Sequence, residues 1–169
     1  MTKFDYIKFQ EELKYILIEL FNSNKNDICG FALSSDEDAR SVTVSINTKK
    51  HLISCWDEDE DEDKEYYKWY PAEWKSEAIN DDGINKLSMI LFNLERTKNS
   101  KNDKRAIYEL LVDTLKQLKK DGVFASVNKD FVLVFNVTDN DDLESDLRWM
   151  KELNNEKLFS EYKSWTETW

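Results

Sequence analysis

The chain has 169 residues, a net charge of −11 and an isoelectric point near 4.7. This charge disfavours direct binding to nucleic acid or to an anionic membrane surface, because phosphate groups repel an acidic protein. Hydrophobic residues make up 40%, which is enough for one packed core, and no apolar run reaches the roughly 20 residues that a membrane-spanning helix needs. We therefore expect a single domain over residues 1–169 in a cytoplasmic protein.

The first third of the chain predicts a helix followed by a hairpin. Apolar residues at helical spacing predict an amphipathic helix over residues 3–22. Ile28–Ser34 and Val42–Ile46 have the composition of strands, and the turn-forming residues between them indicate an antiparallel pair. Gly30 marks a place in the first strand where another group packs closely.

The middle of the chain contains the most unusual composition. Thr48 can cap a short helix that runs through Trp56. The next seven residues all carry carboxylates: Asp57, Glu58, Asp59, Glu60, Asp61, Glu62 and Asp63. These neighbouring charges repel one another and have nothing apolar to bury, so residues 57–65 are expected to form an exposed acidic loop. Tyr66–Tyr70 has the composition of a strand, which Pro71 would end.

The last part of the chain predicts three helices and one strand. Gly83 precedes one helical pattern, and a second pattern runs to Lys120 before Gly122 stops it. Phe131–Val137 is apolar on both faces, which predicts a central strand. The carboxylates of Asp139–Asp142 favour the start of another helix. The C-terminal end of the chain carries a final apolar stripe of Leu158, Tyr162, Trp165 and Trp169 at helical spacing. The pattern predicts an α+β fold with a mainly antiparallel sheet of about four strands, packed with amphipathic helices.

The sequence contains no recognised motif for catalysis or for a cofactor. His51 is the only histidine and is expected at the surface. Cys29 and Cys55 are 26 residues apart, without metal-ligand spacing, and are expected to be reduced. The acidic clusters at 36–38 and 139–142 lack the glycine of a calcium loop, so they predict turns and helix caps. We expect no catalytic residue, no cofactor and no metal site. A magnesium site would need carboxylates that converge from several elements.

The most specific motif is Trp69-Tyr70-Pro71-Ala72-Glu73-Trp74, here called the signature. It occurs in order with Phe31–Asp38, the Asn47-Thr48 pair, Glu77 and Asp121-Gly122-Val123-Phe124. With these segments the sequence resembles the bacterial domain-of-unknown-function family 4303 over roughly residues 5–163. The resemblance implies a small cytoplasmic bacterial protein. Some members of the family occur in toxin-immunity settings. It supplies no catalytic residues, and the acidic run is not part of the motif.

The signature itself has two interpretations. In the first, Trp69, Pro71, Glu73 and Trp74 are mainly structural, because large aromatic side chains chiefly bury area and Pro71 fixes the backbone between them. In that corner Glu73 would accept hydrogen bonds from nearby backbone N–H groups. In the second, the signature borders a shallow pocket with Glu73 or Glu77 as its polar group.

These observations favour a non-catalytic binding protein with a basic protein as its partner. The leading hypothesis is an immunity (antitoxin-like) protein that neutralises a basic toxin domain, with Asp57–Asp63 as the partner-binding surface. A merely solvated acidic loop is the competing interpretation of that run. The alternative function is a small enzyme or ligand-binding domain with a pocket near the signature, and a third is an adaptor without a toxin partner. No membrane or direct nucleic-acid partner is expected.

Overall fold

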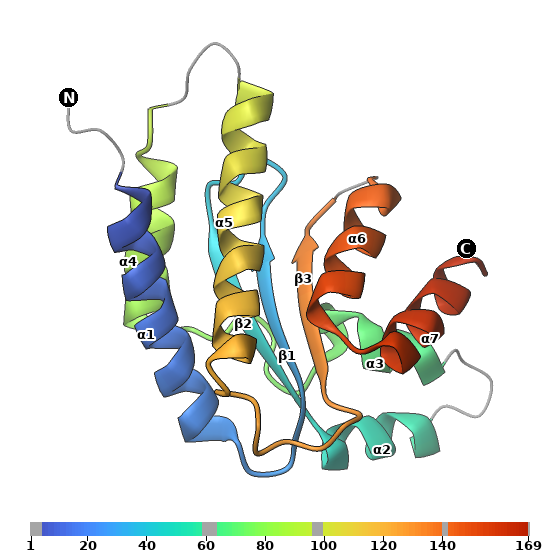
Figure 1. Ribbon diagram of the computed structural model, residues 1–169. Coiled ribbons are helices and arrows are strands. Elements are labelled where there is room, and N and C mark those ends of the chain that lie inside the picture. The colour runs from blue at the N-terminus through green and yellow to red at the C-terminus, as the bar shows by residue number, and fades with distance from the viewer. Residues whose placement is uncertain (1–4, 59–63, 96–99, 140–141, 169) are drawn as a thin grey trace.

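The computed structural model describes residues 5–58, 64–95, 100–139 and 142–168, and its centre is a mixed sheet with helices on both faces (Figure 1). The described strands are β1 (Ile28–Ser35), β2 (Val42–Thr48) and β3 (Val132–Val137), in the order β2-β1-β3. β1 pairs with β2 antiparallel and with β3 parallel. The predicted α+β class is confirmed. The expectation of about four mainly antiparallel strands is wrong, because these three strands form one antiparallel and one parallel pair.

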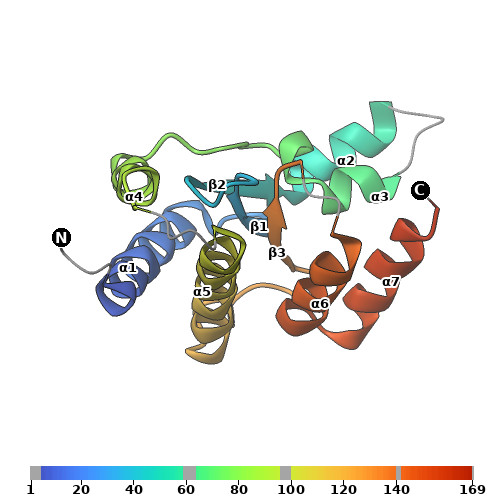
Figure 2. The ribbon, with the colours of Figure 1, turned by 90° about the horizontal axis from the view of Figure 1, so that it is seen from above.

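The helices form two groups on opposite sides of the sheet. Figure 2 shows α1 and α5 on one side and α2 and α3 on the other. α4 lies beside β2, whereas α6 lies beside β3. The elements are α1 (Tyr6–Asn24), α2 (Lys49–Glu58), α3 (Lys64–Trp69), the 3-10 helix η1 (Pro71–Glu73), α4 (Asp82–Phe92), α5 (Ser100–Lys120), α6 (Leu143–Leu153) and α7 (Glu156–Thr166).

The two faces of the sheet carry different cores, because successive strand residues point to opposite sides. On the first face, Phe31 and Leu33 of β1 pack with α1, α4 and α5 in the larger core. The second face of β1 carries the small residues Gly30, Ala32 and Ser34, which leave room for large aromatic side chains. A second cluster covers part of this face and consists of Ala32, Trp69, Trp74, Val132, Val134, Met150, Leu158, Tyr162 and Trp165.

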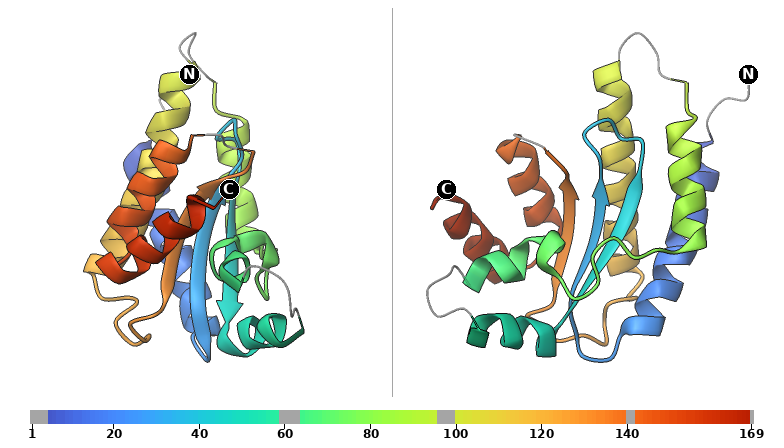
Figure 3. Two further views of the ribbon diagram at one scale, coloured as in Figure 1. Left: turned by 90° about the vertical axis from the view of Figure 1, so that its right-hand side faces the viewer. Right: turned by 180° about the vertical axis from the view of Figure 1, so that it is seen from behind.

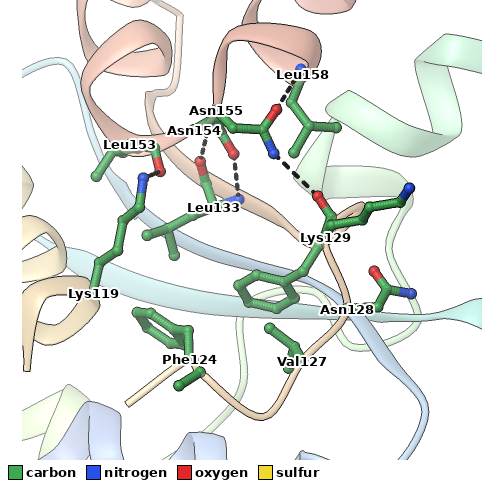
Figure 4. Close-up of a pocket in the computed structure, with 12 residues that line it drawn as sticks. Lys119, Phe124, Val127, Asn128, Lys129, Leu133, Leu153, Asn154, Asn155 and Leu158 are labelled. Atoms are coloured by element: carbon green, nitrogen blue, oxygen red, sulfur yellow. Dashed lines mark hydrogen bonds between the residues drawn. The ribbon is translucent and has the colours of Figure 1, made fainter. Parts of the chain in front are cut away.

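β3 is buried on both faces, as predicted. It lies at an edge of the sheet, however, so the prediction that it is a central strand is wrong. Its outer edge is covered by α6. The side chain of Asn154 takes the place of a neighbouring strand there: Oδ1 accepts from the N–H of Leu133 at 3.0 Å and Nδ2 donates to its carbonyl at 2.8 Å (Figure 4). One side-chain amide, that of Asn154, thereby pairs the backbone N–H and the carbonyl of Leu133 at the edge of the sheet.

Asn154→Leu should lower the free energy of unfolding by about 1–3 kcal/mol, because it leaves two backbone groups of Leu133 without partners. Chemical denaturation measures the loss. Asn85→Leu, at an exposed position of α4, is the matched control and should change stability by less than about 0.5 kcal/mol. Equal effects of the two substitutions would show that Asn154 does not cap the edge.

The edge of β2 that faces away from β1 is covered by the segment that follows the signature. Ile46 and Ser76 exchange two backbone hydrogen bonds of 2.9 and 3.0 Å, and Ile79 N donates to Val44 O at 2.7 Å. The Ser88 hydroxyl accepts from Val42 N at 3.0 Å and donates to its carbonyl at 2.9 Å. This segment runs past β2 to α4 (Figure 3, right). It contributes an isolated bridge at Ser76 instead of a further strand.

The predicted strand Tyr66–Tyr70 is wrong, because this stretch lies almost entirely in helix α3. Aromatic composition is common in strands, but here the contacts have helical spacing. Tyr66 stacks on Tyr70 with ring centroids 5.0 Å apart, and Trp69 Nε1 donates to Glu65 at 2.7 Å. Both pairs are separated by four residues, which places their side chains on the same side of one turn.

Several local predictions are confirmed. The hairpin, α1 and α5 lie close to their predicted positions. Thr48 Oγ1 accepts from the N–H of His51 at 3.3 Å at the start of α2. Gly122 has φ +78° and ends α5, and Asp142 caps α6 by accepting from Ser145 N at 3.1 Å. Of the predicted C-terminal stripe, Leu158, Tyr162 and Trp165 are buried, and Trp169 lies outside the described residues.

Candidate functional site

The signature forms a tight corner between α3 and the segment that covers β2. Trp69 ends α3 and Pro71 begins η1, and both are buried. Trp69 is 2% exposed and packs edge-on against Tyr162 of α7, with ring centroids 5.4 Å apart. Trp74 is 4% exposed. This burial is what a structural role for the two tryptophans requires.

Trp74 also explains the glycine in β1. A Cβ atom placed on Gly30 would lie 2.8 Å from Trp74 Cη2 and 3.1 Å from Val132 Cγ2. Carbon atoms do not approach this closely without a shift of the indole ring, which is held in a packed cluster. The close packing predicted at Gly30 is therefore confirmed, and its partner is the last residue of the signature.

Glu73 and His51 connect the signature to α2. The Glu73 carboxylate accepts from the Tyr66 hydroxyl at 3.4 Å, a side-chain donor in place of the backbone N–H groups that were expected. The Glu73 carbonyl lies 2.9 Å from His51 Nε2. Since a carbonyl only accepts, Nε2 carries the proton. His51 is half-buried in this contact, so it is less exposed than a residue expected at the surface.

His51 and Cys55 are the nearest approach to a catalytic pair in the described chain, with 3.5 Å between Nε2 and Sγ. A general base for the thiol would need a free lone pair on that nitrogen. The bond to the Glu73 carbonyl requires a proton there instead. The pair therefore does not form a cysteine–histidine dyad in this arrangement.

A cleft of about 530 Å³ opens on the second face of the sheet beside the signature; we call it the sheet-face cleft. Its walls come from the signature (Trp69 to Ala72) and from Tyr162 and Trp165 of α7. Its floor is polar and consists of Ser34, Thr43, Ser45 and Asn136. The large aromatic side chains cover the Gly30–Ala32 end of the sheet, which leaves the Ser34 end open. The cleft lies near the carboxyl ends of the parallel strands β1 and β3, where α/β proteins commonly bind ligands.

The lining of the sheet-face cleft is acidic. Its charged residues are Glu77, Asp139 and Asp146, and no lysine, arginine or histidine is among the described residues that line it. Burial, with a further contribution from the charge of Asp146, raises the pKa of Tyr162. The phenol therefore stays neutral and adds no negative charge to the cleft. Such a site attracts a cation and repels phosphates and carboxylates.

Two lining residues have a strained backbone. Ala78 has φ +42° and Asp139 has φ +57°, a region that residues with a Cβ rarely occupy. Ala78 is held there by its N–H, which donates to Ser45 Oγ at 3.1 Å on the floor of the cleft. Strained backbone is often concentrated at functional sites, where the surrounding structure maintains it. The floor itself is ordered by Ser34, whose hydroxyl donates to Asn136 Oδ1 at 2.5 Å.

The predicted acidic loop over residues 57–65 is wrong at its two ends, which are helical. Asp57 is exposed in the last turn of α2, which Glu58 ends, and α3 already starts at Lys64. The rest of the predicted partner-binding run lies outside the described residues: Asp59, Glu60, Asp61, Glu62 and Asp63.

Metal chemistry receives no support from the described part of the chain. Within it, no three His, Cys, Asp or Glu side chains lie close enough together to hold a metal ion. Neither Cys29 nor Cys55 is in a disulfide. Asp36 accepts from the N–H groups of Asp38 and Arg40 at 2.9 and 3.0 Å, as predicted for a turn.

A smaller cavity of about 250 Å³ lies between the end of α5 and the α6–α7 turn (Figure 4). Lys119, Asn154 and Asn155 of its lining make hydrogen bonds within the fold. Lys119 Nζ donates to Leu153 O at 2.7 Å, and burial lowers the pKa of this amine. Asn155 caps α7 through Leu158 N at 3.0 Å. We therefore assign this cavity a structural role.

Sequence reasoning missed the floor of the sheet-face cleft. Ser34 and Asn136 are 102 residues apart in the chain and meet because β1 and β3 pair in parallel. A signal was present for Asn136, which interrupts an apolar run, whereas Ser34 simply ends the apolar part of its strand. Glu77, proposed as a pocket residue, does line the cleft, whereas Glu73 is not among its lining residues.

The family model of the Domain of unknown function (DUF4303) matches residues 10–155. The chain belongs to this family. The match includes the hairpin, the signature, Asn136 and Asp146, and it ends before Tyr162 and Trp165. No curated protein and no solved structure gives a significant match. Among the described helices, none combines the length and the hydropathy needed to cross a bilayer.

Proposed function

We propose that this member of the family is a non-catalytic binding protein that holds a cationic side chain of a basic partner protein in the sheet-face cleft. The observation that carries the proposal is the acidic lining of the cleft, in which the charged residues among those described are Glu77, Asp139 and Asp146. The partner class is that of a toxin domain, which the protein would neutralise in the cytoplasm as an immunity protein does.

The chemistry of the cleft suits a guanidinium or ammonium group. Tyr70 is 43% exposed and provides an aromatic wall whose ring face attracts cations, beside the buried rings of Trp69 and Tyr162. Asp146, which is half-buried, and the exposed Glu77 provide negative charge that attracts such a cation. The net charge of −11 would accelerate the encounter with a basic partner.

Neutralising two carboxylates of the cleft should weaken binding. Glu77→Gln with Asp146→Asn should raise Kd by roughly tenfold or more, about 1.4 kcal/mol or more. The partner is first obtained by pull-down from the native bacterium, and Kd is then measured by calorimetry. Glu11→Gln with Glu19→Gln on exposed positions of α1 makes the same change in net charge away from the cleft. Equal losses in both double variants would show that total charge matters and the cleft does not.

The acidic run has a separate expected role in steering. Replacing Asp57, Asp59, Asp61 and Asp63 with asparagine should leave the melting temperature unchanged or slightly higher, because self-repulsion falls. The association rate should fall, and its dependence on salt should weaken. Stopped-flow measurements at low and high ionic strength test this. An unchanged association rate would mark the run as a solvated segment, whereas faster dissociation would indicate direct contacts.

A small cationic ligand is the second candidate, because the volume of the cleft lies within the range of about 300–1,000 Å³ typical of small-molecule sites. The two functions differ in what is needed for tight binding. A small-molecule site should bind its ligand tightly without a protein partner, whereas a single basic side chain should bind only weakly when isolated.

A further inference from the structure

A second pocket, of about 320 Å³, lies at the opposite end of the same strands; we call it the lysine pocket. Cys29 and Val132 belong to its lining, whereas Ser34 and Asn136 belong to the sheet-face cleft. Its cationic and apolar groups come from α2, α3 and α7 and comprise Lys49, Lys68, Lys157, Leu52, Ile53 and Trp56.

Lysine side chains gather at this pocket, although the whole protein is acidic. Three lysines line it, and Asp130 is the one carboxylate among its described lining residues. Lys157 Nζ lies 3.0 Å from Asp130, and Lys68 Nζ lies 2.5 Å from Glu161. These ion pairs fix two of the ammonium groups beside the pocket, and Lys49 adds a third at an exposed position. Asp130 and Glu161 therefore offset two of the three lysines, and Lys49 is the one that adds further positive charge to the pocket.

Helix α2 carries positive charge at its N-terminal end, which is the opposite of the charge distribution that the helix dipole favours. Its first turn contains Lys49 and Lys50 and no acidic residue, although the helix dipole favours negative charge at that end. The helix start is already capped, since Lys50 N donates to Asp27 Oδ2 at 3.0 Å. The lysine side chains, and not free N–H groups, therefore supply the positive charge. Sequences that break a local stability rule often do so at functional sites.

The remaining wall is apolar and ordered. Ile53 is 52% exposed, and Trp56 lies one helical turn from Leu52. The Trp56 indole N–H donates to Lys64 O at 2.9 Å, which fixes the ring. Burial raises the pKa of the Cys29 thiol to about 12, so this lining residue adds no negative charge near neutral pH.

We propose that the lysine pocket binds a small phosphorylated ligand with a flat apolar ring. The ring would pack on Ile53 and Trp56, and the phosphate would contact Lys49 with Lys68 and Lys157. Lysine ammonium groups act as point charges that suit a phosphate without fixing its orientation. This site is independent of the sheet-face cleft, which is acidic and repels the same ligand.

Adenosine 5′-monophosphate is the probe, with adenosine and inorganic phosphate as its two halves. Calorimetry or NMR titration of the full chain should show the nucleotide binding at least tenfold more tightly than either half. Lys49→Met and Ile53→Asp should each weaken binding tenfold or more. Lys50→Met, at the adjacent exposed lysine, and Ile7→Asp, at an exposed isoleucine of α1, are the controls and should leave it unchanged.

Melting temperatures of all four variants establish that the fold is retained, and each substitution is at an exposed position for that reason. The proposal is overturned if the nucleotide does not bind at millimolar concentration, or if phosphate alone binds equally well. It is also overturned if Lys50→Met weakens binding as much as Lys49→Met does. None of these outcomes bears on the cleft, because Glu77→Gln with Asp146→Asn should leave nucleotide binding intact.

Discussion

Trp69→Ala should lower the free energy of unfolding by about 3–5 kcal/mol, because it removes a large buried side chain from the second core. The indole ring is 2% exposed and packs against Tyr162, and its N–H donates to Glu65 at 2.7 Å. Lys68 Nζ also lies 4.7 Å from the ring centre. Loss of the ring therefore leaves a cavity, removes the hydrogen bond to Glu65 and leaves Lys68 without its aromatic contact.

Urea denaturation measures this loss, and Tyr15→Ala is the control for removing an aromatic residue from an exposed helix position. Tyr15 is 65% exposed, so its replacement should change stability by less than about 0.5 kcal/mol. If Trp69→Ala kept its full melting temperature while losing partner binding, the structural interpretation of the signature would be wrong. The tryptophan would then belong to a surface site.

Gly30→Ala should destabilise the protein by about 1–3 kcal/mol, through overpacking. The new methyl group would approach Trp74 Cη2 to 2.8 Å and Val132 Cγ2 to 3.1 Å. Trp74→Phe shortens the opposing ring system, so Gly30→Ala should cost less in that background. The double-mutant cycle should give a coupling energy of at least about 0.5 kcal/mol.

Gly83→Ala is the matched control for the added methyl group. Its Cβ would also meet a close neighbour, Ile16 Cδ1 at 2.9 Å, but that atom is the end of a flexible side chain on α1. The cost at Gly83 should therefore be smaller than at Gly30. Additive effects of Gly30→Ala and Trp74→Phe would contradict direct contact between the two positions.

Much of the fold follows from local sequence patterns, and the errors have physical causes. Periodicity and turn residues located α1, the hairpin and α5, since each satisfies its own pattern within a short window. Tyr66–Tyr70 was misread because aromatic residues suit both strands and helices, and the choice depended on contacts with Glu65 and Tyr162. The edge position of β3 was also hidden, because α6 buries it as fully as a neighbouring strand would.

The candidate site was predictable only in part. The signature drew attention to the region that borders the sheet-face cleft, and Glu77, named as a pocket residue, lines it. The cleft also needs Asn136 and Asp146, which reach it through the parallel pairing of β3 and the packing of α6. No local pattern specifies a contact such as that between Ser34 and Asn136, 102 residues apart. The acidic run was the conspicuous feature, whereas the acidic cleft was assembled from dispersed residues.

The central claim is that the sheet-face cleft binds a cationic side chain, and an NMR titration tests it most directly. The ¹⁵N-labelled protein is titrated with N-acetyl-arginine amide and, separately, with N-acetyl-citrulline amide, which has nearly the same shape without the charge. We predict weak, saturable shifts at Ser45, Ala78 and Asn136 with the arginine compound, reduced by Glu77→Gln with Asp146→Asn and absent with the citrulline compound. Equal shifts with both compounds, or shifts confined to residues outside the cleft, would contradict the claim.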